Sequence, residues 1–320
     1  MMTMTKRTIL EPLAFAALIA LAGCAATDAE PPVAPPVVAD GQTRFRTPEE
    51  AVQALAQFAA SASTAAADEL FGPGGTDLVQ SGDPVADRNS AAGVKRLIDE
   101  RVAFEDLDDD TLIPVFGNDD WPFPVPLVRD ASGWRFDTET GREEVANRRI
   151  GRNELSVLAT LHAAVDAQME YFAGAHGGRP GTYAQRFFST EGMRDGLYWP
   201  TGEDEAPSPL GPLIADATGE GYSLNNTEPS PYHGYFYHLL AAQGPSAPGG
   251  AMSYLDADGE MTRGFAILAW PAEHGDSGVM TFIVNERGIV FQKDLGAETN
   301  TAAAAITEFD PDDTWDPTGD

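Results

Sequence analysis

The chain has 320 residues, more than one average domain, and this length predicts two domains of ordinary size. Twenty Lys and Arg residues stand against 50 Asp and Glu residues, so the net charge is −30 and a nucleic acid would be repelled rather than bound. Hydrophobic residues make up 42% of the chain, enough to form folded cores, while a single cysteine excludes an intramolecular disulfide and a multi-thiolate metal site.

Residues 1–23 have the layout of a secretory signal peptide. Lys6 and Arg7 form a short positive segment, and the apolar run at residues 13–21 is shorter than the roughly 20 residues that a membrane-spanning helix needs. We therefore expect this segment to direct export and to be absent from the mature protein.

The end of this segment, with Leu21, Ala22 and Gly23 before Cys24, resembles the lipobox of bacterial lipoproteins. The resemblance implies cleavage before Cys24 and attachment of lipid to its sulfur; a durable anchor needs more than one acyl chain. The alternative is an incidental cysteine beside an ordinary cleavage site. Ala25 follows the cysteine, where an aspartate would resemble a signal for inner-membrane retention. The expected location is therefore the outer membrane, with the protein facing the periplasm.

Residues 24–43 are rich in proline, with Pro31, Pro32, Pro35 and Pro36 among Ala, Val and acidic residues. This composition predicts an extended tether of the polyproline type, because such segments lack the apolar residues needed for a packed core. The tether would separate the lipid anchor from the folded part of the chain.

Residues 44–145 are predicted to form a small α+β domain. Thr47 and Pro48 are typical of the start of a helix, and the apolar spacing at residues 51–59 continues it. Residues 68–84 are rich in Gly, Asp and Pro and predict a loop, followed by a second helix at 90–102. The acidic residues 105–110 are expected to face solvent. Short strands are predicted at 111–116, 124–129 and 133–136.

Residues 146–296 are predicted to form a second domain, a long helix packed on an antiparallel meander sheet, so the fold class is α+β. Asn153 is predicted to cap this helix, which continues to Phe172 with an apolar face that includes Leu161, Val165 and Met169. Residues 174–226 are irregular in pattern. Strands are then expected at 232–240, 251–255, 264–270, 278–285 and 289–293.

The order of a long helix, an irregular connection and an antiparallel sheet is similar to the globular heads of type IV pilins. The pilin leader and the long apolar spine are absent from this sequence, so assembly into a pilus does not follow. Residues 297–320 are acidic and are predicted to form a solvated tail.

Candidate catalytic residues are few. Residues 275–278, Gly-Asp-Ser-Gly, copy the nucleophile motif of trypsin-like proteases, but His274 is too close along the chain to act as the base for Ser277, and a hairpin turn explains the same residues. Ser277, His274 and Asp195 are the candidates for a hydrolase that acts on a glycan or a peptide. No nucleotide-binding loop or zinc-protease motif is present, and no cofactor is predicted.

Two groups of residues carry metal-binding side chains. His233 and His238 lie in one predicted strand at a separation that places them on opposite faces. Asp256, Asp258 and Glu260 form only a fragment of a calcium-binding loop, and the same segment is typical of a hairpin turn. Low-affinity binding of divalent cations is therefore kept as an alternative function.

Aromatic residues are concentrated in the second predicted domain. Five of them are candidates for contact with a ligand: Tyr198, Trp199, Tyr232, Tyr235 and Tyr237. If they are exposed together, they can stack on a glycan or a partner protein, whereas buried rings are ordinary core residues. Their exposure in the folded protein decides between the two interpretations.

Several unusual motifs are distributed along the mature chain, each occurring once. They are Trp-Pro-Phe-Pro at 121–124, Gly-Trp-Arg-Phe-Asp at 133–137, Arg-Arg-Ile-Gly-Arg-Asn-Glu at 148–154, Asp-Gly-Leu-Tyr-Trp-Pro at 195–200, Ser-Pro-Leu-Gly at 208–211, Gly-Phe-Ala at 264–266 and Lys-Asp-Leu-Gly at 293–296. Together they resemble an uncharacterised bacterial envelope family, domain-of-unknown-function family 2950, over nearly the whole chain from about Arg44. The resemblance implies a secreted or lipid-anchored protein and carries no catalytic residues.

These observations favour a non-enzymatic, lipid-anchored envelope protein that binds or scaffolds another component. The expected partners are the membrane, through the anchor, and an envelope protein or a glycan. A periplasmic hydrolase and a divalent-cation binder are the alternatives.

Overall fold

The computed structural model describes residues 37–39, 41–61, 63, 66–174, 180–202, 204–223 and 230–319. The predicted signal peptide at 1–23, its Leu21, Ala22 and Gly23, and Cys24 lie outside these residues. All described residues belong to one unit of the chain, residues 36–320. In this part of the chain no helix is both long and apolar enough to cross a membrane.

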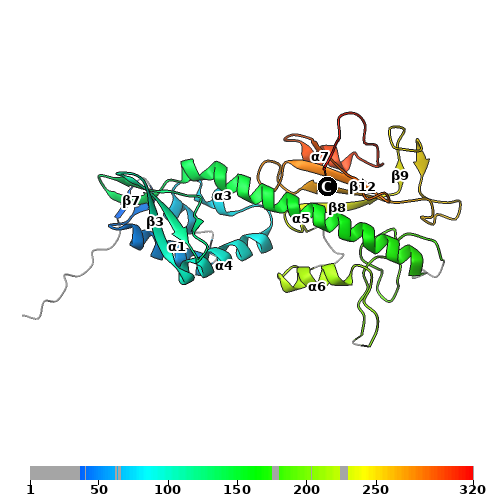
Figure 1. Ribbon diagram of the computed structural model, residues 1–320, viewed down its shortest axis with the longest axis horizontal. Coiled ribbons are helices and arrows are strands. Elements are labelled where there is room, and N and C mark those ends of the chain that lie inside the picture. The colour runs from blue at the N-terminus through cyan, green and yellow to red at the C-terminus, as the bar shows by residue number, and fades with distance from the viewer. Residues whose placement is uncertain are drawn as a thin grey trace, which may run out of the picture. The chain divides into compact units, whose positions relative to one another are not determined.

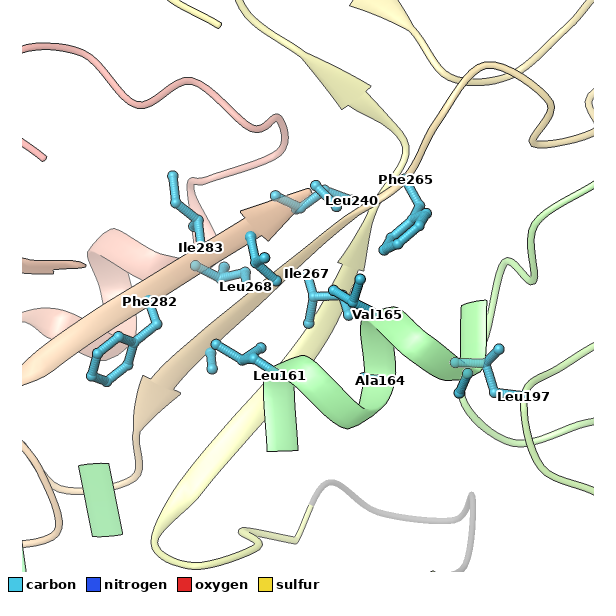
Figure 2. Close-up of a cluster of buried hydrophobic side chains, with 14 of the residues drawn as sticks. Leu161, Ala164, Val165, Leu197, Leu240, Phe265, Ile267, Leu268, Phe282 and Ile283 are labelled. Atoms are coloured by element: carbon cyan, nitrogen blue, oxygen red, sulfur yellow. The ribbon is translucent and has the colours of Figure 1, made fainter. Parts of the chain in front are cut away.

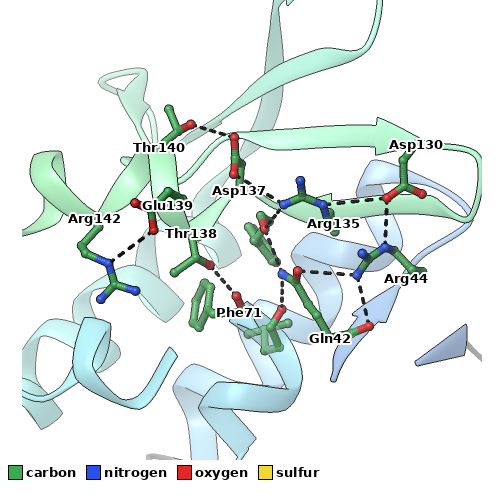
Figure 3. A network of polar contacts seen from close by, with 12 residues as sticks. Gln42, Arg44, Phe71, Asp130, Arg135, Asp137, Thr138, Glu139, Thr140 and Arg142 are labelled. Atoms are coloured by element: carbon green, nitrogen blue, oxygen red, sulfur yellow. Dashed lines mark hydrogen bonds and ion pairs between the residues drawn. The ribbon is translucent and has the colours of Figure 1, made fainter. Parts of the chain in front are cut away.

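The chain enters its fold earlier than the predicted tether allows. Strands β1 (Val37–Ala39) and β2 (Gln42–Arg44) form an antiparallel hairpin. The Gln42 side chain is buried and donates from Nε2 to the carbonyl oxygens of Leu70, at 3.2 Å, and Phe136, at 2.9 Å. Arg44 donates from Nε to Asp130 at 3.2 Å (Figure 3). The prediction that the tether reaches residue 43 is therefore wrong at its end.

Four helices follow this hairpin. The first, α1 (Pro48–Ser61), begins as predicted, with Thr47 Oγ1 accepting from the Glu50 backbone N–H at 3.3 Å and the apolar stripe buried. The predicted loop at 68–84 is wrong, because α2 (Ala67–Phe71) and α3 (Gly75–Val79) form there and bury their apolar side chains. Helix α4 (Pro84–Glu100) begins before residue 90 because Asp83 caps it, accepting from two backbone N–H groups of its first turn.

The first sheet is antiparallel and contains β3 (Val102–Asp108), β4 (Thr111–Phe116), β5 (Trp121–Pro122), β6 (Leu127–Asp130) and β7 (Gly133–Phe136). Its main order is β3-β4-β6-β7, with β5 paired to β4. The acidic run that was expected to face solvent forms most of β3, an edge strand with mainly exposed side chains. A charged edge resists pairing with another chain, which explains why this strand tolerates so many carboxylates.

Helix α5 (Thr138–Gly174) is much longer than the sequence pattern predicted. Its start is held by Thr138, whose Oγ1 donates to the Phe71 carbonyl oxygen at 2.6 Å (Figure 3). Asn153, the predicted cap, is buried inside the helix, so that prediction is wrong. The predicted domain boundary near residue 145 also falls inside α5, and the division into two domains stays a prediction.

Helix α5 packs on the second sheet, which contains β8 (Tyr235–Leu240), β11 (Ala266–Pro271), β12 (Met280–Asn285), β13 (Val290–Asp294) and β14 (Asp316–Pro317). All neighbouring strands are antiparallel, in the order β14-β13-β12-β11-β8. Leu161 and Val165 of α5 lie beside Ile267 and Leu268 of β11 in one buried apolar cluster (Figure 2). The predicted helix-on-meander arrangement is confirmed, although Met169 is 46% exposed and lies off the buried face.

The remaining elements complete this part of the fold (Figure 1). Helix α6 (Gly211–Gly219) precedes it, and β9 (Ala242–Gln243) pairs with β10 (Met252–Ser253). The predicted solvated tail is wrong: α7 (Thr299–Ala304) and β14 form within residues 297–320, and Phe309 is only 1% exposed. The apolar residues among the acids, such as Ala303 and Phe309, gain more from burial than the tail gains from full hydration.

Candidate functional site

The three hydrolase candidates do not form hydrogen bonds with one another; each interacts with a different neighbouring residue. The Ser277 hydroxyl is buried in the turn between β11 and β12, where it accepts from the Glu273 N–H at 2.9 Å and donates to the Glu273 carbonyl oxygen at 3.2 Å. His274 Nε2 lies 2.8 Å from Asp294 Oδ1. The Gly-Asp-Ser-Gly motif therefore forms the hairpin turn that its composition allowed.

Asp195, the third candidate, stabilises a different turn. Its carboxylate accepts from the Thr190 backbone N–H at 2.8 Å and from the Thr190 hydroxyl at 2.9 Å. These hydrogen bonds, with the nearby Arg186 guanidinium, lower the pKa of Asp195 below its ordinary value despite some desolvation. A carboxylate held in its charged form in this way is a poor proton donor near neutral pH.

The acidic candidates for calcium are used by a hairpin. Asp256 Oδ1 accepts from the backbone N–H groups of Asp258, at 2.9 Å, and Glu260, at 3.0 Å, while Gly259 adopts a positive φ of 84°. This geometry confirms the predicted turn. Among the described residues, no three His, Cys, Asp or Glu side chains are grouped so that they could hold a metal ion.

The two histidines do not share a strand as expected. His233 lies in the turn before β8, with a positive φ of 49°, and its Nε2 is 3.3 Å from Glu220. His238 lies in β8 and is exposed. The prediction of one strand over 232–240 is therefore wrong at its start.

The five aromatic candidates do not form one exposed surface. Tyr235 and Trp199 are buried in the core, and Tyr235 donates from its hydroxyl to the Met280 carbonyl oxygen at 3.0 Å. Tyr198 and Tyr237 are partly buried and pack against the same core.

Tyr232 is half-buried between two other rings. Its ring centroid lies 5.0 Å from that of Tyr222 and 4.2 Å from that of His233. Burial raises the pKa of Tyr232 to about 12, so its hydroxyl stays protonated. A binding role for these rings stays a prediction.

A cavity that could hold a ligand lies in the part of the fold that contains α4 and the first sheet. This partly open cavity of about 730 Å³ is lined by α1, α2, α3, α4, β5 with the residues that follow it, and the first half of α5. This volume lies within the range of roughly 300–1,000 Å³ that is typical of small-molecule sites. Its walls are mainly apolar and include Phe58, Leu78, Val94, Leu97, Trp121 and Phe123.

Helix α4 forms one wall and is incompletely packed. It is an amphipathic helix, yet none of its residues is fully buried. Val94 and Leu97 are only partly buried against the first apolar cluster. A Cβ atom built on Gly93, which also lines the cavity, meets no atom within 4 Å. The apolar face of α4 therefore borders open space rather than a filled core.

Four arginines line the cavity with this apolar wall: Arg88, Arg148, Arg149 and Arg152. Two of them are already engaged. Arg148 donates to Glu144, at 2.6 Å, and to the Pro122 carbonyl oxygen, at 2.8 Å. Arg149 is 9% exposed, donates to the Leu78 carbonyl oxygen at 2.6 Å and pairs with Asp276.

The other two arginines are available to a ligand. Arg88 of α4 and Arg152 of α5 are exposed, and neither has a hydrogen-bond or ion-pair partner among the residues that the structure describes. Partial desolvation and the neighbouring charge of Arg149 lower the pKa of the Arg152 guanidinium. An anion placed beside Arg152 would relieve that repulsion.

Among the described residues that line the cavity, Asp87 is the one acidic side chain. Its carboxylate accepts from the Ser81 hydroxyl at 2.6 Å and from the Ser81 backbone N–H at 3.1 Å. Burial nevertheless raises the pKa of Asp87 above its ordinary value, because desolvation outweighs these hydrogen bonds.

The motif at residues 148–154 positions α5 between this cavity and the second sheet. Beyond the arginines, Asn153 Nδ2 donates to the Ser277 carbonyl oxygen at 2.9 Å. Glu154 Oε1 accepts from the backbone N–H groups of Val279, at 3.0 Å, and Met280, at 2.9 Å. Successive residues of one helix therefore bond to both regions of the fold.

Asp83 makes a second connection between the region around the first sheet, which contains α1 to α4, and the region around the second sheet. Besides capping α4, its Oδ2 accepts from the Tyr222 hydroxyl at 2.8 Å and from the Gly234 backbone N–H at 2.9 Å. All four acceptor contacts are buried or partly buried, and Asp83 itself is 1% exposed. No sequence motif marks Asp83 or the cavity; the one signal in the sequence is the clustering of three arginines at 148–152 in an acidic chain.

Comparison with known proteins gives a family but no activity. The chain belongs to the family described as protein of unknown function (DUF2950), whose family model matches residues 42–318. No curated protein and no solved structure matches the chain. The similarity to pilin heads thus has no matching structure to support it and stays a prediction.

Proposed function

We propose that this chain is a non-enzymatic binding protein of the cell envelope that holds an apolar ligand in the cavity beside α4. The observation that carries the proposal is a 17-residue amphipathic helix without one fully buried residue, placed over a cavity of about 730 Å³. Exposing apolar surface to water costs about 25 cal/mol per Å², so a ligand that covers this surface would gain that free energy.

The envelope location rests on the sequence before the described residues. Leu21, Ala22 and Gly23 before Cys24 support lipidation of Cys24 and retention at the outer membrane. Cells grown with an alkyne-modified fatty acid should label the protein, and Cys24→Ser should remove both the label and the protein from the membrane fraction. Labelling of Cys24→Ser equal to that of the parent chain would disprove the anchor.

Steric blocking tests the cavity. Gly93 and Gly151 both lie inside helices and both have open space around an added Cβ, but only Gly93 lines the cavity. We expect the neutral dye N-phenyl-1-naphthylamine to bind the parent chain and Gly151→Phe with a saturable increase in fluorescence. Gly93→Phe should lose this signal, because its ring occupies the site.

Two outcomes would contradict this function: no saturable binding to the parent chain, or equal binding by Gly93→Phe and Gly151→Phe. Circular dichroism of each variant establishes that it is folded. No contact among the described residues favours the hydrolase or the divalent-cation alternative. The envelope protein or glycan partner expected from the sequence stays a prediction.

A further inference from the structure

Building on the proposed function, we propose that the ligand is an amphiphile with one apolar chain and an anionic head. Its apolar chain lies against Val94 and Leu97, and its head lies at Arg88 and Arg152. The apolar chain of the ligand is inferred from the apolar walls of the cavity. The negative charge of its head is inferred from the two arginines, which have no hydrogen-bond or ion-pair partner among the described residues.

The charge of the cavity wall is opposite to that of the protein as a whole. The chain carries 20 Lys and Arg against 50 Asp and Glu, whereas the described residues of the wall include four arginines and one aspartate. A cavity lined at random would share the acidic balance of the chain. A local positive excess attracts anions even when the surrounding surface repels them.

Within the wall, the charge is divided between structural and free arginines. Arg148 and Arg149 are bonded to backbone carbonyl oxygens and carboxylates of the fold. Arg88 and Arg152 have no such partner among the described residues and come from two of the helices that border the cavity, α4 and α5. Because a guanidinium donates several hydrogen bonds in one plane, a carboxylate or phosphate monoester matches it well.

Asp87 is one carboxylate beside four arginines, so it offsets only part of this positive charge. Its oxygen atoms are bonded to the backbone and the hydroxyl of Ser81, and burial favours its neutral form. A cationic head would therefore lie beside the unpaired guanidinium groups of Arg88 and Arg152. The nearby carboxyl group of Asp87 already accepts hydrogen bonds from Ser81. The wall discriminates against cations and favours anions.

Calorimetric titration of the full chain with decanoate, decyl maltoside and decyltrimethylammonium, each below its critical micelle concentration, tests the head-group preference. The three probes share one chain length and differ in charge. We expect decanoate to bind more tightly than decyl maltoside, and decyltrimethylammonium to bind most weakly. Decyl phosphate separates the two anionic heads: tighter binding than decanoate assigns a phosphate, and weaker binding assigns a carboxylate.

The arginines are then tested one at a time. Arg88→Gln and Arg152→Gln should each weaken decanoate binding by roughly threefold to tenfold, as expected for partly exposed charge pairs. Binding of decyl maltoside should not change. Arg287→Gln is the matched control, because Arg287 is exposed in the turn between β12 and β13 and does not line the cavity.

The outcomes separate this inference from the function on which it rests. Equal affinity for decanoate and decyl maltoside, unchanged in both arginine variants, overturns the anionic head but leaves an apolar binding site. Preferential binding of decyltrimethylammonium overturns it as well. Failure of every probe to bind, together with failure of N-phenyl-1-naphthylamine, removes the binding function itself.

Discussion

The two apolar clusters of this protein are packed to different degrees. In the second sheet, nearly every residue of β11 and β12 is buried, and α5 fills the space above them. In the first region, α4 covers a cavity and has no fully buried residue. Well-packed interiors contain few voids larger than a water molecule, so the cavity beside α4 departs from ordinary packing.

This difference shows that residue type alone does not locate a binding surface. The aromatic residues that attracted attention in the sequence, such as Tyr235 and Trp199, belong to the filled core. Phe58 and Trp121, which no motif set apart as ligand-facing, line the cavity and keep part of their surface exposed. Incomplete packing, rather than aromatic content, identifies the candidate site.

The largest expected contrast comes from removing one phenylalanine in each region. Phe282 of β12 is 1% exposed, and Phe282→Ala should lower the free energy of unfolding by about 3–5 kcal/mol. Phe58→Ala should cost only about 1–2 kcal/mol, because its ring already borders open space. Urea unfolding followed by circular dichroism measures both. Equal costs would mean that the first region is packed as tightly as the second.

A smaller loss is expected where the two regions meet. Asp83→Ala removes the cap of α4 and leaves the Tyr222 hydroxyl and the Gly234 N–H without their acceptor. The expected cost is about 2–4 kcal/mol, from a lost cap worth about 1 kcal/mol and two lost hydrogen bonds worth about 0.5–1.5 kcal/mol each. Asp99→Ala, an exposed position in the same helix, is the control and should stay within about 0.5 kcal/mol of the parent. If Asp83→Ala and Asp99→Ala changed the free energy of unfolding by similar amounts, Asp83 would not stabilise the contact between the two regions.

Glycine substitutions compare open and filled space directly. Gly93→Ala and Gly151→Ala should each raise the free energy of unfolding by up to about 1 kcal/mol, because alanine favours a helix and neither methyl group meets another atom. Gly141→Ala, also in α5, should instead destabilise the protein, since its Cβ would lie 2.8 Å from Val125 Cα. If Gly93→Ala behaves like Gly141→Ala, the cavity is filled in solution.

The smallest effects concern pH, and the two regions should respond with opposite sign. Burial raises the pKa of Asp87, so the parent chain loses stability as pH rises from its unfolded value to its folded value. Asp87→Asn lacks this titration and should gain relative stability over the same interval.

In the second region, the Gly296 N–H and His274 lower the pKa of Asp294. The stability that Asp294 contributes is present above its ordinary value near 3.8 and is lost as pH falls through the folded value. Asp294→Asn should therefore lose relative stability as pH rises. Thermal unfolding at a series of pH values measures both variants, and slopes of the same sign would contradict the comparison.

The local residue pattern was sufficient to predict an element where that element is regular and is buried on one side. The start of α1 at Pro48, the strands at 111–116 and 133–136, and the antiparallel meander were predicted because capping residues and alternation act over a few positions. The first half of α5 was missed because residues 138–152 carry many charges and no apolar stripe. That segment is held by distant contacts, such as Thr138 with Phe71 and Arg149 with Asp276.

The sequence by itself determined the strongly acidic character, the α+β class and the family, because these depend on composition and on short motifs. Only the tertiary structure decided which aromatic residues are core and where a cavity remains. The cavity walls come from segments between Leu55 and Arg152 that are far apart in the chain. Whether such walls meet tightly or leave space depends on how whole helices and sheets pack, and this information is absent from local residue spacing.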